Sequence, residues 1–472
     1  MKISIENFKS IKKLQNFELK PMTILSGVNS AGKSSFVQFL LLLKQTIKRD
    51  SPKHQLLLSE YLYSTTNYKN IFHNQEDKNK PKISFLIEKQ EFDRIEKPKI
   101  VQFFKGLGTY NCLVNVEFGI SKEKKIYISL FSMSFNFADE KKSISFITDD
   151  NNKQIIETDS PIFIENVLNS PIQNIDLEFN SIFPTIANFE KETITSDLDN
   201  NASKSIQNFS EVVKIHDVKE ALSLFFDDLS YIGPARSEPQ EMYQIQEHHE
   251  EVGKNGEFVS QILKEKATKI ISYRKLLIKD DGVINYLEES GKLLNAVKYW
   301  MCDIFNVAED IFSEKEDDVY KIYLTNKNKL KTNIKHVGFG ISQLLPIVVQ
   351  GLLMSKNGVL IIEQPEIHLH PKIQSWVYDF LYSLTLEGKR ILVETHSSHF
   401  ITRMRRRIAE DETDEMDDLI NLTFIENNVF RTLKIDDYGT ILHYYPKDFI
   451  EVPNEELKAI VDAQMKKRLR NG

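Results

Sequence analysis

Cysteine is scarce in this sequence: 472 residues contain only Cys112 and Cys302, which are far apart and form no C-x-x-C pair. A disulfide framework and a cysteine-bound zinc ion are therefore not expected, and the scarcity fits a reducing cytoplasm. A secretory signal is lacking too, because residues 1–5 read as an edge strand. These absences together predict a cytoplasmic protein.

Long apolar runs and an excess of one charge sign are also missing. The longest apolar stretch, residues 338–354, is interrupted by serine, glutamine and proline, so we expect a buried helix there and not a membrane span. The 61 basic and 68 acidic side chains give a net charge of −7, so no global field attracts the chain to nucleic acid. No heptad repeat is sustained, which excludes a long coiled-coil arm.

What the chain does have is a complete G-x-x-x-x-G-K-S loop at residues 27–34, after a short apolar strand and before an apolar helix pattern. The backbone N–H groups of such a loop and the following helix N-terminus bind polyphosphate. Lys33 is expected to reach the β- and γ-phosphates, and the Ser34 hydroxyl to bind Mg²⁺. A purely structural glycine turn is the alternative.

A second motif follows an apolar run, residues 358–362, that is typical of a strand buried on both faces of a parallel sheet. The run ends in Glu363-Gln364-Pro365-Glu366. The Glu363 carboxylate is expected to bind Mg²⁺ opposite Ser34. A core strand that merely ends in a surface acid is the alternative.

A third motif, residues 390–396, again places polar residues after an apolar strand, here Glu394-Thr395-His396. The segment 372–386 reads as a crossover helix, so the two strands form a βαβ unit whose ends line a ligand crevice. His396 is expected to hydrogen-bond the γ-phosphate or the attacking water. A loop histidine without a function is the alternative.

The fourth motif is the glycine pair Gly338 and Gly340 at the start of the apolar helix that contains Ser342. It predicts a second bare helix N-terminus suited to an anion. One ATP does not need two such ends from one subunit, so this end is expected to reach the ATP of a second copy. A tight turn packed on the core is the alternative.

The order of these motifs resembles the SMC-like and overcoming-lysogenisation-defect-like branch of the ABC ATPases. Within it, the chain is similar to prokaryotic predicted ATPases with a Glu-Gln-Pro-Glu strand end. The opening K-I-S-I-E-N-F-K-S-I, the segment Y-I-G-P-A-R at 231–236 and the H-L-H-P run at 368–371 carry the same resemblance, which covers residues 1–45 and 229–450. The chain is also similar to the ATPase half of phage anti-restriction-induced (PARIS-like) defence systems.

The resemblance implies an α/β fold: an ABC- or SMC-like ATPase head with an antiparallel β lobe, a helical insertion and a parallel phosphate-loop core. The expected domains are lobe I at 1–236 with an insertion at about 140–215, a helical insertion or lid at 237–310, and lobe II at 311–472. It also implies an ATP-dependent homodimer or larger homo-oligomer that sandwiches ATP and Mg²⁺.

The resemblance assigns site residues by position. The nucleotide-binding residues of the phosphate loop are Asn29, Ser30, Ala31, Gly32, Lys33, Ser34 and Ser35, and Asn7 and Lys9 lie near the ribose or α-phosphate. Gly338, Gly340 and Ser342 of the fourth motif match the glycine-rich signature of the family, which contacts the ATP of the other subunit. The catalytic set is Glu363, Gln364, Glu366 and His396, with Ser34 and Glu363 as the Mg²⁺ ligands.

Gln364 departs from the family, because most ABC ATPases have a glutamate after the magnesium carboxylate. An amide can position water but cannot accept its proton, which weakens a general-base contribution of about 10²–10⁴-fold. Either Glu366 or His396 substitutes, or the enzyme hydrolyses ATP slowly and spends most of its time bound to ATP. The second case favours a switch or clamp over a motor.

Elsewhere the sequence predicts alternating strands at 82–88, 111–120 and 125–136, a hairpin turn at 149–152 and a polar loop at 185–215. The basic clusters at 403–407 and 466–470 are interpreted as solvated helix faces, with phosphate contacts on an assembled oligomer as the alternative.

The leading functional hypothesis is an ATPase that senses an invader product and controls a separately encoded effector, such as a nuclease, in antiphage defence. The residues after His396 lack the acidic E-G-x-x-D and D-x-D patterns of the nuclease domain found in that family, so any nuclease is expected on another chain. The alternatives are a nucleotide-gated scaffold that sequesters a partner with little hydrolysis, and an SMC-like DNA-repair ATPase.

Overall fold

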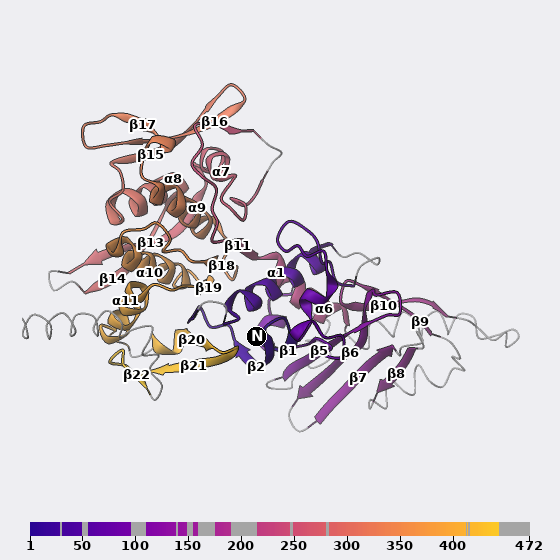
Figure 1. Ribbon diagram of the computed structural model, residues 1–472. Coiled ribbons are helices and arrows are strands. Elements are labelled where there is room, and N and C mark those ends of the chain that lie inside the picture. The colour runs from indigo at the N-terminus through magenta and orange to yellow at the C-terminus, as the bar shows by residue number, and fades with distance from the viewer. Residues whose placement is uncertain are drawn as a thin grey trace, which may run out of the picture. The chain divides into compact units, whose positions relative to one another are not determined.

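The computed structural model describes residues 1–28, 31–49, 55–95, 110–137, 140–148, 154–158, 175–189, 215–245, 249–279, 283–411, 413 and 416–442. The chain divides into two compact units, whose elements are labelled in Figure 1. The first comprises Met1–Leu19 and Ser34–Leu229, and the second comprises Lys20–Lys33 and Ser230–Gly472. The strand before the phosphate loop therefore belongs to the second unit, together with the segment expected as an insertion at 237–310.

The first unit is built on a seven-stranded antiparallel sheet in which buried and half-exposed side chains alternate, as the period of two requires. Its strands, in spatial order, are β2 (Ile11–Glu18), β1 (Lys2–Phe8), β4 (Lys82–Glu88), β5 (Tyr110–Ile120), β6 (Ile126–Phe137), β7 (Glu140–Thr148) and β8 (Gln154–Thr158). The antiparallel lobe predicted from the sequence is thus confirmed. The turn predicted at 149–152 lies outside the described residues, although the flanking β7 and β8 do pair.

Helices and a hairpin complete this unit. They are α1 (Lys33–Arg49), η1 (Tyr68–Ile71), η2 (His73–Gln75), α2 (Lys89–Phe92), β9 (Ile175–Asn180), β10 (Phe183–Phe189) and α6 (Ile215–Asp227). The polar loop predicted at 185–215 is wrong for its first residues, because β10 continues to Phe189 in register with β9. Residues 190–214 lie outside the described part.

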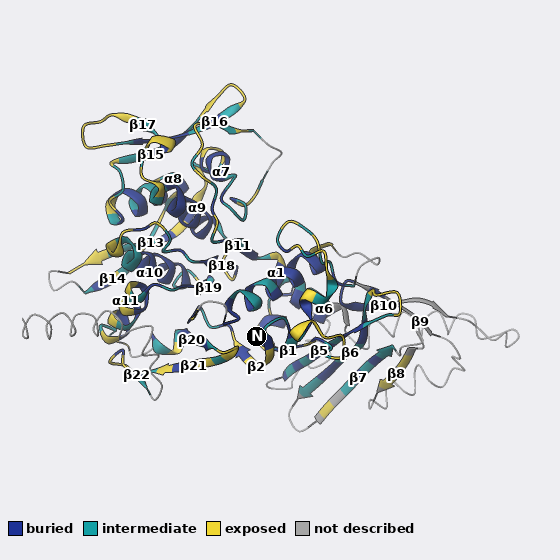
Figure 2. Ribbon diagram, viewed as in Figure 1, coloured by how far each residue is buried: buried dark blue, intermediate teal, exposed yellow. Residues whose placement is uncertain are grey.

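The second unit holds a seven-stranded sheet in which β18, β19, β3 and β20 run parallel. The spatial order is β11 (Leu229–Ile232), β18 (Val359–Glu363), β19 (Arg390–Glu394), β3 (Met22–Gly27), β20 (Ile420–Glu426), β21 (Val429–Ile435) and β22 (Ile441–Leu442). Strands β3 and β18 are buried along their whole length, which explains their largely apolar sequences. The burial of each described residue is drawn in Figure 2. The α/β fold class is therefore as predicted, with an antiparallel lobe and a parallel phosphate-loop core.

Helices connect the strands of this sheet. Helix α9 (Phe339–Leu353) precedes β18, α10 (Pro371–Thr385) crosses from β18 to β19, and α11 (Ser398–Ala409) follows β19. The predicted βαβ unit is thus confirmed, as is a buried helix in place of a membrane span, with Pro346 inside it. Among the described residues, none of the helices combines the length and the apolarity needed to cross a membrane.

The segment between Ile232 and Phe339 is only partly helical. Its elements are β12 (Tyr243–Gln244), α7 (Val259–Glu265), β13 (Ile270–Ile278), β14 (Ile284–Lys292), α8 (Leu293–Lys298), the π-helical turn η4 (Tyr299–Ile304), β15 (Asp310–Glu316), β16 (Val319–Thr325), β17 (Lys331–Asn333) and η5 (Ile334–His336); η6 (Asp417–Leu419) lies later. The helical prediction missed the β13–β14 hairpin. Strand β13 buries Ile271 and Tyr273 between exposed neighbours, a period of two that marks a strand.

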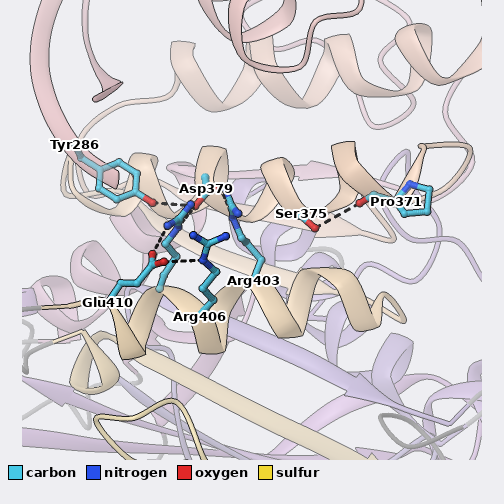
Figure 3. Close-up of polar contacts among 8 residues, drawn as sticks. Tyr286, Pro371, Ser375, Asp379, Arg403, Arg406 and Glu410 are labelled. Carbon is cyan, nitrogen blue, oxygen red and sulfur yellow. Dashed lines mark hydrogen bonds and ion pairs between the residues drawn. The ribbon is translucent and has the colours of Figure 1, made fainter. Parts of the chain in front are cut away.

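A buried carboxylate fixes α11 and the hairpin to α10 (Figure 3). Asp379, fully buried on α10, accepts hydrogen bonds from Arg403 Nε at 2.7 Å, Arg407 Nε at 2.8 Å and the Tyr286 hydroxyl at 3.2 Å. The interpretation of residues 403–407 as a solvated face is therefore wrong for Arg403 and Arg407. These two guanidinium groups compensate a buried charge, as buried charges require.

Replacing this carboxylate should destabilise the second unit. Asp379→Asn leaves Arg403 without its counter-charge and Arg407 with Glu410 alone, and breaking such a buried pair costs about 3–5 kcal/mol. Both tryptophans of the chain, Trp300 and Trp376, lie in the second unit, so urea denaturation followed by tryptophan fluorescence reports its unfolding. The exposed Asp318→Asn is the matched control. Equal midpoints for both variants would contradict the assignment.

Candidate functional site

The phosphate loop leaves the carboxyl end of β3 through two glycines with left-handed backbones. Gly27 has φ +138°, and a Cβ there would lie 2.1 Å from the backbone oxygen of Ile425 on β20. Gly32 has φ +105°, a conformation that favours glycine. The first glycine of the motif is therefore required by strand packing as well as by the loop. Ala31 is buried, and the predicted residues Asn29 and Ser30 lie outside the described part.

Lys33 bridges the two ends of this loop. Its Nζ donates to the backbone oxygens of Gly27 at 3.0 Å and Val28 at 2.7 Å, and the side chain is almost fully buried. Burial lowers the pKa of Lys33, while the nearby Glu394 carboxylate opposes that shift. The ammonium group is thus held at the loop that is expected to bind phosphates.

The remaining amino-terminal candidates make contacts within the first unit. Asn7 and Lys9 both have left-handed backbones, and the Asn7 amide donates to the Lys80 oxygen at 3.3 Å. The Lys9 ammonium bonds Gln38 and lies 4.7 Å from the Tyr63 ring centre. The Ser35 hydroxyl is 2.7 Å from that of Ser10, and Ser34 belongs to the same unit. Their contacts with a nucleotide stay predictions.

Glu363 ends β18 as a buried carboxylate with a phenol partner. The Tyr231 hydroxyl donates to its Oε1 at 2.6 Å. In the parallel register, Glu363 lies beside Glu394 at the end of β19. Burial raises the pKa of Glu363, and the hydrogen bonds with Tyr231 and Glu394 oppose that shift.

Arg236 holds the chain where β18 ends. Its Nη2 donates to the backbone oxygens of Glu363 at 2.9 Å and Gln364 at 3.1 Å. Gln364 has φ +48°, and its N–H donates to the Glu394 oxygen at 2.7 Å, so the peptide is fixed from both sides. Burial lowers the pKa of Arg236 to about 10, and its Nε and Nη1 are buried without a hydrogen-bond partner among the described residues.

Glu366 joins the loop after β18 to the loop after β19. Its carboxylate accepts from the His396 N–H at 2.6 Å and the Thr395 hydroxyl at 2.9 Å. The backbone oxygen of Thr395 accepts a hydrogen bond from the Ser26 hydroxyl of β3 at 2.9 Å. Burial raises the pKa of Glu366, whereas burial and the charge of Lys33 lower that of His396. The lowered pKa of His396 favours the neutral form of its imidazole.

The signature residues differ in what surrounds them. A Cβ at position 340 would lie 2.6 Å from the His368 backbone oxygen, so Gly340 is required by packing. The Ser342 hydroxyl donates to the Phe339 oxygen at 2.7 Å. Gly338 is the N-cap of α9 without a side-chain cap, and a Cβ there would meet nothing within 4 Å. Of these residues, Gly338 alone faces open space.

The second unit thus brings Lys33, Glu363, Gln364, Glu366 and His396 to the carboxyl ends of β3, β18 and β19. Three further residues at this edge were not predicted as site residues: Tyr231, Arg236 and Glu394. The Y-I-G-P-A-R segment and the matching acids at two strand ends could have indicated them.

Within the described ranges, no group of three or more His, Cys, Asp or Glu side chains could hold a metal. Mg²⁺ at nucleotide sites uses one or two carboxylates together with phosphates and water, and the Glu363 carboxylate is an oxygen donor of that kind.

Comparison with known proteins places the chain in a family. A family model described as an AAA ATPase domain matches residues 1–401, and the chain belongs to that family. No curated protein matches it in sequence.

Three solved structures show a distant likeness. An SMC head bound to the C-winged helix domain of ScpA has a TM-score of 0.34 and 11% identity over 92% of this chain and 97% of that one. The SMC head domain from Thermotoga maritima has a TM-score of 0.34 and 8% sequence identity, over 92% of this chain and 98% of that one. The third structure is an Smc head domain with an extended coiled coil, bound to the C-terminal domain of ScpA, derived from Pyrococcus furiosus. It has a TM-score of 0.30 and 11% sequence identity, over 92% of this chain and 96% of that one.

The two signature glycines should respond differently to the same substitution. Gly340→Ser forces a Cβ against the His368 carbonyl and should cost about 1–3 kcal/mol of stability, the range for overpacking. Gly338→Ser meets open space and supplies a favoured N-cap, so its change should stay within about 0.5 kcal/mol. Urea denaturation by tryptophan fluorescence compares them. Equal destabilisation would show that the His368 contact does not decide the requirement for glycine.

Arg236 should act on turnover and not on ATP affinity. Arg236→Met releases the Gln364 peptide, and a misplacement of about 1 Å can cost on the order of 10² in rate. We expect kcat to fall by about 10–100-fold with KM for ATP nearly unchanged, measured by steady-state phosphate release. The exposed Arg431→Met on β21 is the matched control. A raised KM with unchanged kcat would refute this positioning role.

Proposed function

We propose that this member of the AAA ATPase domain family binds Mg²⁺–ATP at the carboxyl edge of the second unit's sheet. The contacts of Lys33 carry the proposal: its ammonium closes the phosphate loop, lies in the field of Glu394, and its charge lowers the pKa of His396. In this assignment Lys33 and the loop N–H groups bind the phosphates, and Ser34 and Glu363 bind Mg²⁺. When bound, the ion neutralises charge that develops on the γ-phosphate.

Hydrolysis in this proposal is slow. Gln364 occupies the position that orients the attacking water, with its peptide held by Arg236 and the Glu394 oxygen. An amide cannot take the water's proton. Glu366 uses both carboxylate oxygens to hold Thr395 and the His396 N–H, which favours a structural role for it over that of a mobile base. His396, whose pKa is lowered by burial and by the charge of Lys33, is the remaining candidate for a proton acceptor.

The active form is proposed to be a homodimer or larger homo-oligomer. The N-terminus of α9 has no side-chain cap, Gly338 meets open space, and Phe339 is 37% exposed. Unsatisfied N–H groups at a helix N-terminus favour an anion. The γ-phosphate of ATP bound by a second copy would supply that anion, so nucleotide occupancy would set the assembly state.

The biological role that we propose is control of a separately encoded effector, such as a nuclease, in antiphage defence in the cytoplasm. Two arguments support this role. One is the resemblance to phage anti-restriction-induced systems, and the other is Gln364, which would slow ATP hydrolysis and so suits a switch. The same Gln364 favours, as a second candidate, a nucleotide-gated scaffold that sequesters a partner. An SMC-like DNA-repair role has less support, because Arg403 and Arg407 are engaged with the buried Asp379 and are not available for DNA phosphates.

ATP turnover tests this proposal. Lys33→Ala should abolish turnover, and Gln364→Glu, which restores a proton acceptor, should raise kcat by at least about tenfold. Steady-state phosphate release measures both, and light scattering with ATP and Mg²⁺ measures the oligomeric state. A wild-type rate on the order of one per second or faster, typical of working enzymes, would refute the slow switch. Wild-type ATP binding without turnover would favour the gated scaffold.

A further inference from the structure

We propose that a cleft of about 650 Å³ in the second unit is a separate binding site for a small organic anion, such as a phosphate monoester. Three segments line it: the β13–β14 hairpin, the α9–β18 connection (residues 352–356) and the α10–β19 connection (residues 385–389). Its volume lies in the range of small-molecule sites.

The cleft lies at the amino-terminal ends of β18 and β19, whereas the candidate ATP site lies at their carboxyl-terminal ends. Lys389 lines it and directly precedes β19, whose last residue is Glu394. The strand is five residues long, which corresponds to about 16 Å at the usual rise. Lys356 likewise lines the cleft shortly before β18, which ends at Glu363. A ligand here therefore would not compete with ATP but would contact the starts of the two strands that carry the acidic residues.

The side chains that line the cleft carry a net positive charge, because four of them are basic and two are acidic. Both acidic side chains in its wall are engaged with Arg274: Glu387 at 2.6 Å and Glu288 at 3.5 Å. Lys269 and Lys356, in contrast, are exposed and form no ion pair with any residue that the structure describes. An anion that reaches both ammonium groups would gain charge-assisted hydrogen bonds.

Lys389 adds a buried cation whose position is fixed. Its Nζ donates to the carbonyl oxygens of Gly351 at 2.8 Å and Leu352 at 3.2 Å, at the C-terminal end of α9. These bonds satisfy helix carbonyls that would otherwise make the cleft unfavourable for an anion. An ammonium group has three donors, and these two bonds leave one.

The wall formed by the hairpin is held in place without a ligand. The Tyr286 hydroxyl donates to Asp379 (Figure 3), the Tyr286 ring packs edge-on against Tyr382 at 5.4 Å, and Arg274 donates to the Leu386 oxygen at 3.3 Å. A preformed wall spares the ligand the cost of ordering it.

The floor of the cleft is apolar, which argues for an organic ligand over a bare inorganic ion. Ile271, Leu352 and Leu353 are buried residues that line it. A molecule with an anionic head and a flat or apolar body would use both the lysines and this floor. Nucleoside monophosphates and similar phosphate esters have that chemistry.

The test uses the full chain carrying Lys33→Ala, so that binding at the phosphate loop is removed and ATP turnover is not needed. AMP and inorganic pyrophosphate are titrated separately by isothermal titration calorimetry. We expect AMP to bind, and Lys269→Gln with Lys356→Gln to weaken it by about tenfold or more, because each removes a charged hydrogen-bond donor. Lys315→Gln with Lys327→Gln, exposed lysines outside the cleft, removes the same charge and should leave binding unchanged.

The two probes separate the possible ligand classes. Tighter binding of AMP than of pyrophosphate supports an organic anion on the apolar floor. Binding of pyrophosphate alone, or affinities that the Lys269 and Lys356 substitutions leave unchanged, would overturn the proposal, as would the absence of binding by either probe. Because Lys33 is already replaced, none of these outcomes depends on the proposed ATPase activity.

Discussion

A strand that is buried on both faces can carry polar chemistry only where it ends. Ionisable residues follow this constraint in β3, β18 and β19: Glu363 and Glu394 end their strands, and Lys33 comes at the end of the loop after β3. The consequence is a dense group of ionisable side chains in a poorly solvated place, where burial raises the pKa values of Glu363 and Glu366 and lowers that of Lys33. Buried charges need partners.

Much of the Y-I-G-P-A-R segment serves this need. Tyr231 donates to the Glu363 carboxylate, and Arg236 donates to the backbone oxygens of Glu363 and Gln364. Glu366 provides the complementary link, since it accepts from the loop that follows β19. The polar edge is therefore one connected network and not a set of separate residues, so a change at Arg236 would be felt at Gln364.

Sequence patterns predicted the parts whose signals are local. The phosphate loop, the buried strands β18 and β19, the crossover helix α10 and the antiparallel lobe all have a period or a terminal motif within a few residues. The missed features depend on distant partners. Tyr231 and Glu363 are 132 positions apart, and the requirement for glycine at position 340 comes from His368. The sequence around Arg407 predicts a surface residue, because its partner Asp379 is distant in the chain. The apolar spacing around the β13–β14 hairpin predicts a helix, although the segment forms two strands.

The position of β3 also affects how the chain is made. Its Ser26 hydrogen-bonds Thr395, which is 369 residues later in the sequence, and its neighbours β19 and β20 both come from the carboxyl-terminal half. At ribosomal rates of about 5–20 residues per second, β3 must wait roughly 20–80 s until both strands have been synthesised. The strand that carries the phosphate loop is thus synthesised long before the strands that pair with it. A nascent chain exposes this apolar segment throughout that interval, which makes it a natural target for chaperones.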